Sequence, residues 1–201
     1  MNVIHKVAVA FLILLLLQTE ALAANSYFPR GIFSSNNKID VFLADKNSMI
    51  LKSFGEQPLH KLKCYSCVEL RLLWDRGIKS PVLIRIDIKS DSDGTLVKKT
   101  MMRADHIGYL SLSEPLSEEQ IHDLRMNLAG INIKQENHGL PNSNTLDADI
   151  FFLEVATDGE YGLRWRVNID WENDEVKFRE LCLNILDMAG INLESASQAS
   201  L

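Results

Sequence analysis

The chain has 201 residues, and its 21 lysines and arginines against 27 aspartates and glutamates give a formal net charge of −6. Basic residues are scattered through both halves. The sequence therefore shows no footprint for nucleic acid and no basic amphipathic helix that would bind a membrane surface. The length fits one domain, large enough to bury a core without disulfide or metal cross-links.

The first 23 residues have the pattern of a cleaved secretory signal peptide. His5 and Lys6 form a basic start, an apolar run covers 7–17, and the segment ends in Ala-Leu-Ala. The apolar run is about half as long as a bilayer-spanning helix requires. We expect a mature chain that begins at Ala24, is exported to the periplasm or beyond, and has no stable membrane insertion after cleavage. An uncleaved membrane anchor is the alternative.

Residues 24–63 are expected to form an N-terminal arm packed on the main domain. A short helix is predicted over 46–54, with Asp45 or Asn47 as its N-cap and Gly55 as its stop. The main domain is expected over 64–194, and a flexible tail over 195–201.

Three strands are predicted over 67–74, 81–88 and 95–102, because each alternates apolar and polar residues. One face collects Val68, Leu70, Leu72, Trp74, Val82, Ile84, Ile86 and Ile88, and the other collects Glu69, Arg71, Arg85, Asp87 and Lys89. One apolar face and one charged face are typical of an antiparallel sheet with solvent on one side.

A loop is predicted over 103–114, followed by a helix whose N-cap is Ser117. Gln120 completes a capping box with that serine, and Gly130 is expected to end the helix in the left-handed conformation. Two further strands, 149–156 and 161–169, flank Asp158-Gly159, which is a strong hairpin signal. A last amphipathic helix is predicted over 174–189.

These elements predict an α+β fold: an antiparallel sheet of about five strands, with two amphipathic helices covering one face. Both helices end in Ala-Gly-Ile-Asn. Two ββα-like units, the first with an added strand, would explain the repeat. The alternative is that Gly-Ile is simply a common helix cap.

The charged sheet face is the candidate binding site. If the two hairpins share one sheet, the alternation in the second hairpin turns Phe151, Leu153, Val155, Leu163 and Trp165 inward. It turns Glu154, Arg164 and Arg166 outward, beside Arg85. Because guanidinium groups bind carboxylates in planar pairs, we hypothesise that Arg85, Arg164 and Arg166, with Glu154, hold a protein partner or a carboxylate-bearing ligand. The alternative is a set of cross-strand ion pairs on a wet surface.

The chain has three cysteines, Cys64, Cys67 and Cys182. The pair Cys64 and Cys67 leads into a strand rather than opening a helix, which argues against a thioredoxin-like redox pair. An oxidising compartment favours a disulfide, and a bond from Cys64 or Cys67 to Cys182 would close a long loop, with one thiol left over. Free thiols and a redox-active pair are the alternatives.

Catalytic and metal-binding patterns are weak. His106 with Asp105 is the best acid–base candidate, but no nucleophile motif accompanies it. The histidines lack metal-pair spacing, and the cysteine pair offers only half a zinc site, so no metal or cofactor is predicted.

Three segments, RLLWDRGIKSPVLIRI, DGEYGLRWRV and FRELCLNILDMAGI, resemble a family of uncharacterised exported bacterial proteins. The resemblance covers about 49–192, departs at Phe151-Phe152, and implies the compartment and one coherent fold but no activity. The sequence thus favours a non-catalytic binding module of the cell envelope. The alternatives are a hydrolase-type enzyme using His106 with a carboxylate, and a thiol-redox protein using Cys64 and Cys67.

Overall fold

The computed structural model describes residues 27–29, 31–33, 36–62, 66–77, 79–102, 108–131, 149–167 and 176–191. They form an α+β fold with one antiparallel sheet in the order β4-β3-β2-β1-β5-β6. The strands are β1 (Val68–Asp75), β2 (Val82–Ile88), β3 (Gly94–Met101), β4 (Tyr109–Pro115), β5 (Ile150–Thr157) and β6 (Glu160–Val167). The helices are α2 (Lys38–Ser53), α3 (Glu118–Ala129) and α4 (Val176–Met188), with a 3₁₀ turn, η1 (Leu59–Lys61).

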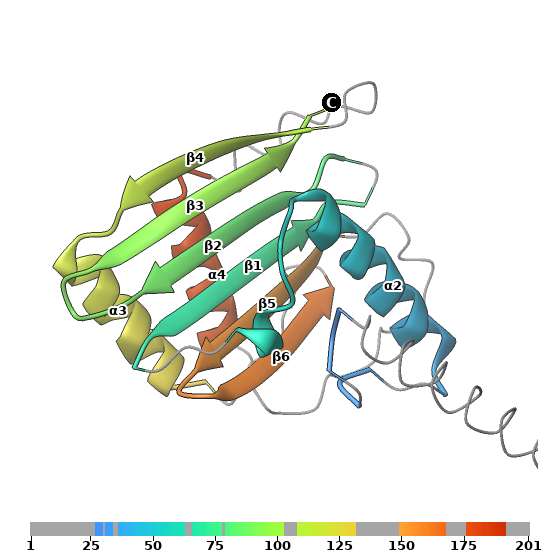
Figure 1. The fold of residues 1–201 in the computed structure, drawn as a ribbon, viewed down its shortest axis with the longest axis horizontal. Coiled ribbons are helices and arrows are strands. Elements are labelled where there is room, and N and C mark those ends of the chain that lie inside the picture. Colours follow the sequence, from blue (N-terminus) through green and yellow to red (C-terminus); the bar gives the residue numbers. More distant parts are fainter. Residues whose placement is uncertain are drawn as a thin grey trace, which may run out of the picture.

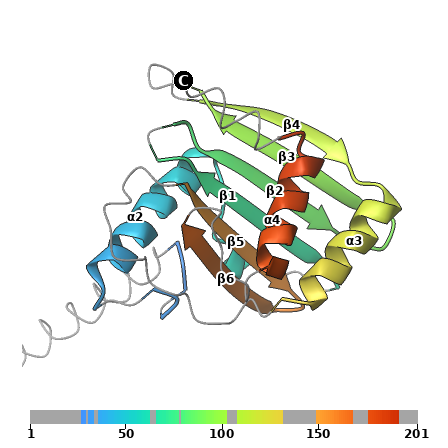
Figure 2. The same ribbon diagram turned by 180° about the vertical axis from the view of Figure 1, so that it is seen from behind.

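Helices α3 and α4 lie across one face of the sheet (Figure 2), which we call the α3/α4 face. This confirms the prediction of two amphipathic helices on one face. The apolar side chains predicted for β1 and β2 are buried there beneath Ile121 and Leu124 of α3 and Phe178 of α4. Trp74 of β1 stacks on Phe151 of β5, with ring centroids 5.7 Å apart.

The opposite face is not the solvated surface that the sequence predicts. Helix α2 and the turn η1 pack on it (Figure 1), and we call it the α2 face. A second core cluster there contains Tyr27, Phe28, Leu43, Leu51, Phe54, Leu73, Leu83, Ile150, Phe152, Leu163 and Trp165. The N-terminal arm therefore supplies one half of a second core.

Helix α2 begins eight residues earlier than predicted, at Lys38, and Asn37 is its N-cap through a bond from the Ile39 amide. Asn47 is not a cap. It is fully buried between Leu43 and Leu51 on one stripe of the helix, and its amide nitrogen donates to the Leu43 carbonyl at 2.7 Å. A polar residue in the middle of the buried stripe hides the helical period from sequence reasoning.

The register of the β5–β6 hairpin corrects the predicted faces. Asp158 and Gly159 both have positive φ, 46° and 79°, as the two-residue turn requires. The turn pairs Thr157 with Glu160, which sets Leu163 opposite Glu154 and Arg164 opposite Leu153. Opposed residues share a face, so Leu163 and Trp165 lie on the α2 face, while Arg164 and Arg166 lie on the α3/α4 face.

Two local predictions are also wrong. The predicted loop 103–114 contains β4, which pairs with β3 from Tyr109 to Pro115. The capping box of Ser117 and Gln120 is confirmed, but Gly130 at the end of α3 is right-handed, with φ −86°. Gly190 after α4 is left-handed, with φ 65°, so the two Ala-Gly-Ile-Asn segments end their helices differently.

Candidate functional site

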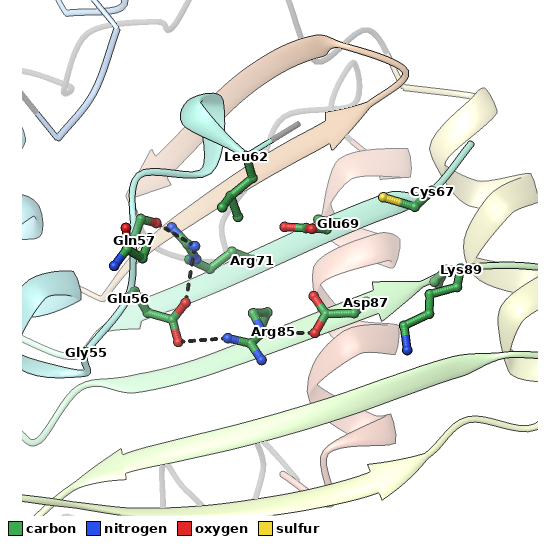
Figure 3. Close-up of a pocket in the computed structure, with 11 residues that line it drawn as sticks. Gly55, Glu56, Gln57, Leu62, Cys67, Glu69, Arg71, Arg85, Asp87 and Lys89 are labelled. Carbon is green, nitrogen blue, oxygen red and sulfur yellow. Dashed lines mark hydrogen bonds and ion pairs between the residues drawn. The ribbon is translucent and has the colours of Figure 1, made fainter. Parts of the chain in front are cut away.

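A cleft of about 440 Å³ opens on the α2 face, over β1 and β2 (Figure 3). The segment between α2 and η1 forms one wall, with Gly55, Glu56 and Gln57, and Leu62 follows η1. The strands supply Glu69, Arg71, Arg85, Asp87 and Ile88, and Cys67 and Lys89 stand at their ends. The cleft has the size of a small-ligand site, and most of its side chains are charged.

Glu56 reaches the cleft because of the way α2 ends. Gly55 is left-handed, with φ 72°, and its amide bonds the Lys52 carbonyl while the Glu56 amide bonds the Leu51 carbonyl. These two bonds form a Schellman cap, which turns the chain sharply at the glycine. The predicted stop at Gly55 is thus confirmed, and the turn directs Glu56 onto the sheet.

Three cations surround the Glu56 carboxylate. The Arg71 guanidinium lies 3.1 Å from it, the Arg85 guanidinium 3.5 Å, and the Lys99 ammonium pairs with the same oxygen that Arg85 approaches. Lys99 also donates to the Phe54 carbonyl, at 2.9 Å, and lies over the Tyr109 ring. The Glu56 side chain is only 2% exposed, so these contacts offset the cost of removing a carboxylate from water.

Arg71 joins this group to a second buried carboxylate. Its guanidinium lies 3.0 Å from Glu154 and also donates to the Tyr27 hydroxyl and the Gln57 carbonyl, at 2.6 and 2.9 Å. Tyr161 donates to the other oxygen of Glu154 at 2.9 Å. Burial raises the pKa of the Glu154 carboxyl, against the opposing effects of the Arg71 charge and the Tyr161 hydrogen bond. These side chains tie β1, β5 and β6 to the N-terminal segment.

Glu69 differs from the other acids of the cleft because no described residue pairs with it. It pairs in register with Asp87 across β1 and β2, so two carboxylates stand directly opposite each other. Asp87 is held by Arg85, whose Nε lies 3.1 Å from a carboxylate oxygen. Figure 3 shows Glu69 apart from these contacts, and among the described residues it makes no hydrogen bond or ion pair. Partial burial and the facing Asp87 raise the pKa of Glu69.

The four residues of the predicted binding set do not form one site. Arg85 lines the cleft, and Glu154 lies in the buried network on the same face. Arg164 instead stacks its guanidinium over the Phe178 ring of α4, 4.8 Å from the centroid. Arg166, also on the α3/α4 face, donates to the carbonyl of Trp165. The sheet therefore separates Arg164 and Arg166 from the cleft.

Sequence reasoning missed Glu56, Lys99, Tyr27 and Tyr161. Glu56 and Tyr27 lie in irregular segments, where no period marks a buried side. Lys99 could have been placed from its strand, since it pairs with Leu83 and so shares the face of Arg85. The face on which Tyr161 lies could also have been predicted from the register that the hairpin turn sets, as for Leu163.

Cys182 is buried and free, which overturns a bond from it to Cys64 or Cys67. Cys67 itself is not a free thiol, and Cys64 lies outside the described residues, so no disulfide joins two described cysteines. His106 and Asp105 also lie outside the described residues, and the catalytic hypothesis on them stays a prediction.

Within the described ranges, no cluster of three or more His, Cys, Asp or Glu side chains is arranged to hold a metal ion. Over the same ranges, none of the helices combines the length and apolar character needed to cross a membrane. No protein-family model matches the chain, and no curated protein matches it.

Proposed function

We propose that this chain is an exported, non-catalytic binding module of the cell envelope, whose ligand places a cationic group in the cleft beside Glu69. One observation carries the proposal: Glu69 is a partly buried carboxylate, faces a second carboxylate, and has no hydrogen-bond or ion-pair partner among the described residues. Export rests on the sequence pattern of residues 1–23, which lie outside the described residues.

The ion pairs of the cleft, rather than its net charge, favour a cation over the carboxylate ligand expected from the sequence. Arg71 is compensated by Glu56 and Glu154, and Arg85 by Glu56 and Asp87. A ligand carboxylate would have to displace these internal partners. A cation near Glu69 displaces none of them, and at about 4 Å and an effective dielectric constant of about 20 it gains about 4 kcal/mol of Coulomb energy before desolvation.

Two sources of such a cation fit the cleft. One is the ammonium or guanidinium group of a small amine, and the other is a lysine or arginine side chain of a protein partner. The volume of about 440 Å³ accommodates either. The recognition chemistry is the same, so experiment has to separate them.

The test is an NMR titration of the ¹⁵N-labelled mature protein with agmatine and, separately, with a short peptide containing one arginine between alanines. Binding predicts amide shifts centred on Glu69 and Asp87 that Glu69→Gln abolishes. The matched control, Glu119→Gln, removes a carboxylate from the exposed surface of α3 and should bind as wild type. Saturation by the peptide alone would identify a protein partner. If neither probe shifts the cleft, or if Glu69→Gln binds equally well, the proposal fails.

The pH dependence of binding is a second readout. Because the pKa of Glu69 is raised, its carboxyl takes up a proton at a higher pH than an ordinary glutamate. The cation should therefore be released as the pH falls through that raised pKa. A ligand held by Arg85 or Lys89 through a phosphate or carboxylate would not follow the titration of Glu69.

The same proposal includes a disulfide between Cys64 and Cys67. Cys182 is free and Cys67 is not, and an exported chain meets an oxidising environment. Cys67 lines the cleft, so this bridge would lie at its rim. Peptide mapping of the unreduced protein should recover 64 and 67 in one cross-linked fragment. Alkylation of Cys64 without prior reduction would contradict the pairing.

A further inference from the structure

Strand β4 is the exposed edge of the sheet. It pairs with β3 on one side, and no described element lies beyond it on the other (Figures 1 and 2). All seven of its residues are exposed. Leu110 is 64% exposed and Leu112 57% exposed, which is unusual for leucines in a sheet.

Strand β4 lacks the features that usually protect an exposed sheet edge from pairing with another strand. Its outer side presents a row of peptide N–H and C=O groups that another β-strand can pair with. Natural edges are usually protected by an internal lysine, a proline or a bulge, yet residues 109–113 read Tyr-Leu-Ser-Leu-Ser. The first charge is Glu114, and Pro115 stands only at the end of the strand.

The two leucines lie on one face. Leu110 pairs with Thr100 and Leu112 with Lys98, and these two positions of β3 share the α3/α4 face with the core residue Leu96. The apolar side of β4 thus continues the face that α3 and α4 cover elsewhere. A partner strand that brings its own apolar residues to this face would bury both leucines.

We propose that β4 pairs antiparallel with β4 of a second copy of this chain, about a two-fold axis at Ser111, and joins two sheets into one. In this register Leu110 of each copy lies opposite Leu112 of the other, so four leucines meet on one face. Tyr109 lies opposite Ser113 on the other face. The paired residues 109–113 carry no charge, so the dimer places no like charges opposite each other.

Neighbouring registers are less favourable. A two-fold axis at Leu112 would set each Leu110 opposite Glu114 of the other copy. An axis at Ser113 would pair Leu112 with that same glutamate and leave Leu110 outside the paired stretch. The axis at Ser111 is the one that pairs leucine with leucine twice, and this makes the second copy a better occupant than an unrelated strand.

The first test is the oligomeric state by sedimentation equilibrium. The wild-type protein should be a dimer, and Leu112→Lys should convert it to a folded monomer, because the position is exposed in the single chain. The matched control is Ser92→Lys in the exposed turn between β2 and β3, which adds the same charge away from the edge and should remain dimeric. A monomeric wild type, or a Leu112→Lys variant that remains dimeric, would overturn the proposal.

The register is tested by cysteine cross-linking. Residues on the two-fold axis of an antiparallel pair have Cα atoms about 4.5–5.5 Å apart, which is within the range for a disulfide. Ser111→Cys should therefore form a covalent dimer under mild oxidation. Two copies of Ser113→Cys would be offset by four residues, about 13 Å along the strands, and should not cross-link.

Preferential cross-linking of Ser113→Cys would refute the register, and equal cross-linking of both variants would indicate random collision. Either result overturns the two-fold pairing at Ser111. The proposal is independent of the cleft, because Glu69 and β4 are separated by β2 and β3 in the sheet. Titration with amines and the dimer measurement can therefore succeed or fail separately.

Discussion

Replacing Arg71 with methionine should destabilise the protein strongly, because it leaves a buried charge without a counter-ion. The variant loses the ion pairs to Glu56 and Glu154, at 3.1 and 3.0 Å, and the hydrogen bonds to Tyr27 and Gln57. Glu56 keeps Lys99 and Arg85, whereas among the described residues Glu154 keeps only the hydrogen bond from the Tyr161 hydroxyl. Breaking a buried pair in this way typically costs about 3–5 kcal/mol. For a domain of this size the melting temperature should fall by about 6–20 °C.

The assay is urea unfolding followed by circular dichroism at pH 7 and at pH 4. Without Arg71, burial holds the pKa of Glu154 above that of the unfolded chain, so the folded state favours the protonated acid. This contribution is fully present below the unfolded pKa of about 4.3 and is lost as the pH rises through the folded pKa. The penalty of Arg71→Met should therefore be smaller at pH 4 than at pH 7.

A double variant isolates the cause. Arg71→Met combined with Glu154→Gln removes the unpaired carboxylate and should recover part of the stability that Arg71→Met alone loses. The control is Arg85→Met, since Arg85 is 32% exposed and its removal should cost less than about 1 kcal/mol. If Arg71→Met costs less than about 1 kcal/mol at pH 7, or if the added Glu154→Gln recovers nothing, the reasoning about the buried network is wrong.

Two further predictions concern Glu69 and Cys182. Glu69→Gln should stabilise the protein at pH 7 by about 0.2–1 kcal/mol, because it removes the repulsion from Asp87. Since the pKa of Glu69 is raised in the folded state, the wild type loses stability as the pH rises through that pKa. The stability gained by Glu69→Gln should therefore disappear near pH 4 in the same unfolding assay. A gain that is independent of pH would show that repulsion between the two carboxylates is not its cause. Burial raises the pKa of the Cys182 thiol. Iodoacetamide should therefore modify it only when urea unfolds the chain, and rapid labelling of the native protein would contradict its burial.

The sequence carried more information about the second hairpin than strict alternation extracts. The prediction assumed that the aromatic and leucine positions of both strands face one core. The Asp158-Gly159 turn already pairs Thr157 with Glu160, and counting back from it places Arg164 opposite Leu153. A sheet buried on both faces has no polar side, so an apolar residue no longer indicates which face it occupies. Turn geometry is then the better guide to the face.

Local signals determined much of the architecture. The alternation in β1 and β2 correctly predicted which of their side chains lie on the α3/α4 face, because a strand packed beneath helices puts every second residue in the core. The capping box at Ser117 and the stop at Gly55 were recognised from neighbouring residues, because caps are made within one turn of the chain.

Only the tertiary structure decided the candidate site. Glu56, Arg71 and Glu154 come from the α2–η1 connection, β1 and β5, and the separations along the chain give no sign of their contact. Arg71 and Glu69 are two residues apart on the same strand and the same face. Arg71 is nevertheless paired with two carboxylates, whereas Glu69 faces a carboxylate of its own charge. The difference comes from Glu56, which reaches Arg71 from outside the sheet, and from Asp87, which stands opposite Glu69 across the strand. Composition and periodicity assign a residue to a face, but the pairing of buried charges depends on which distant segment packs over that face.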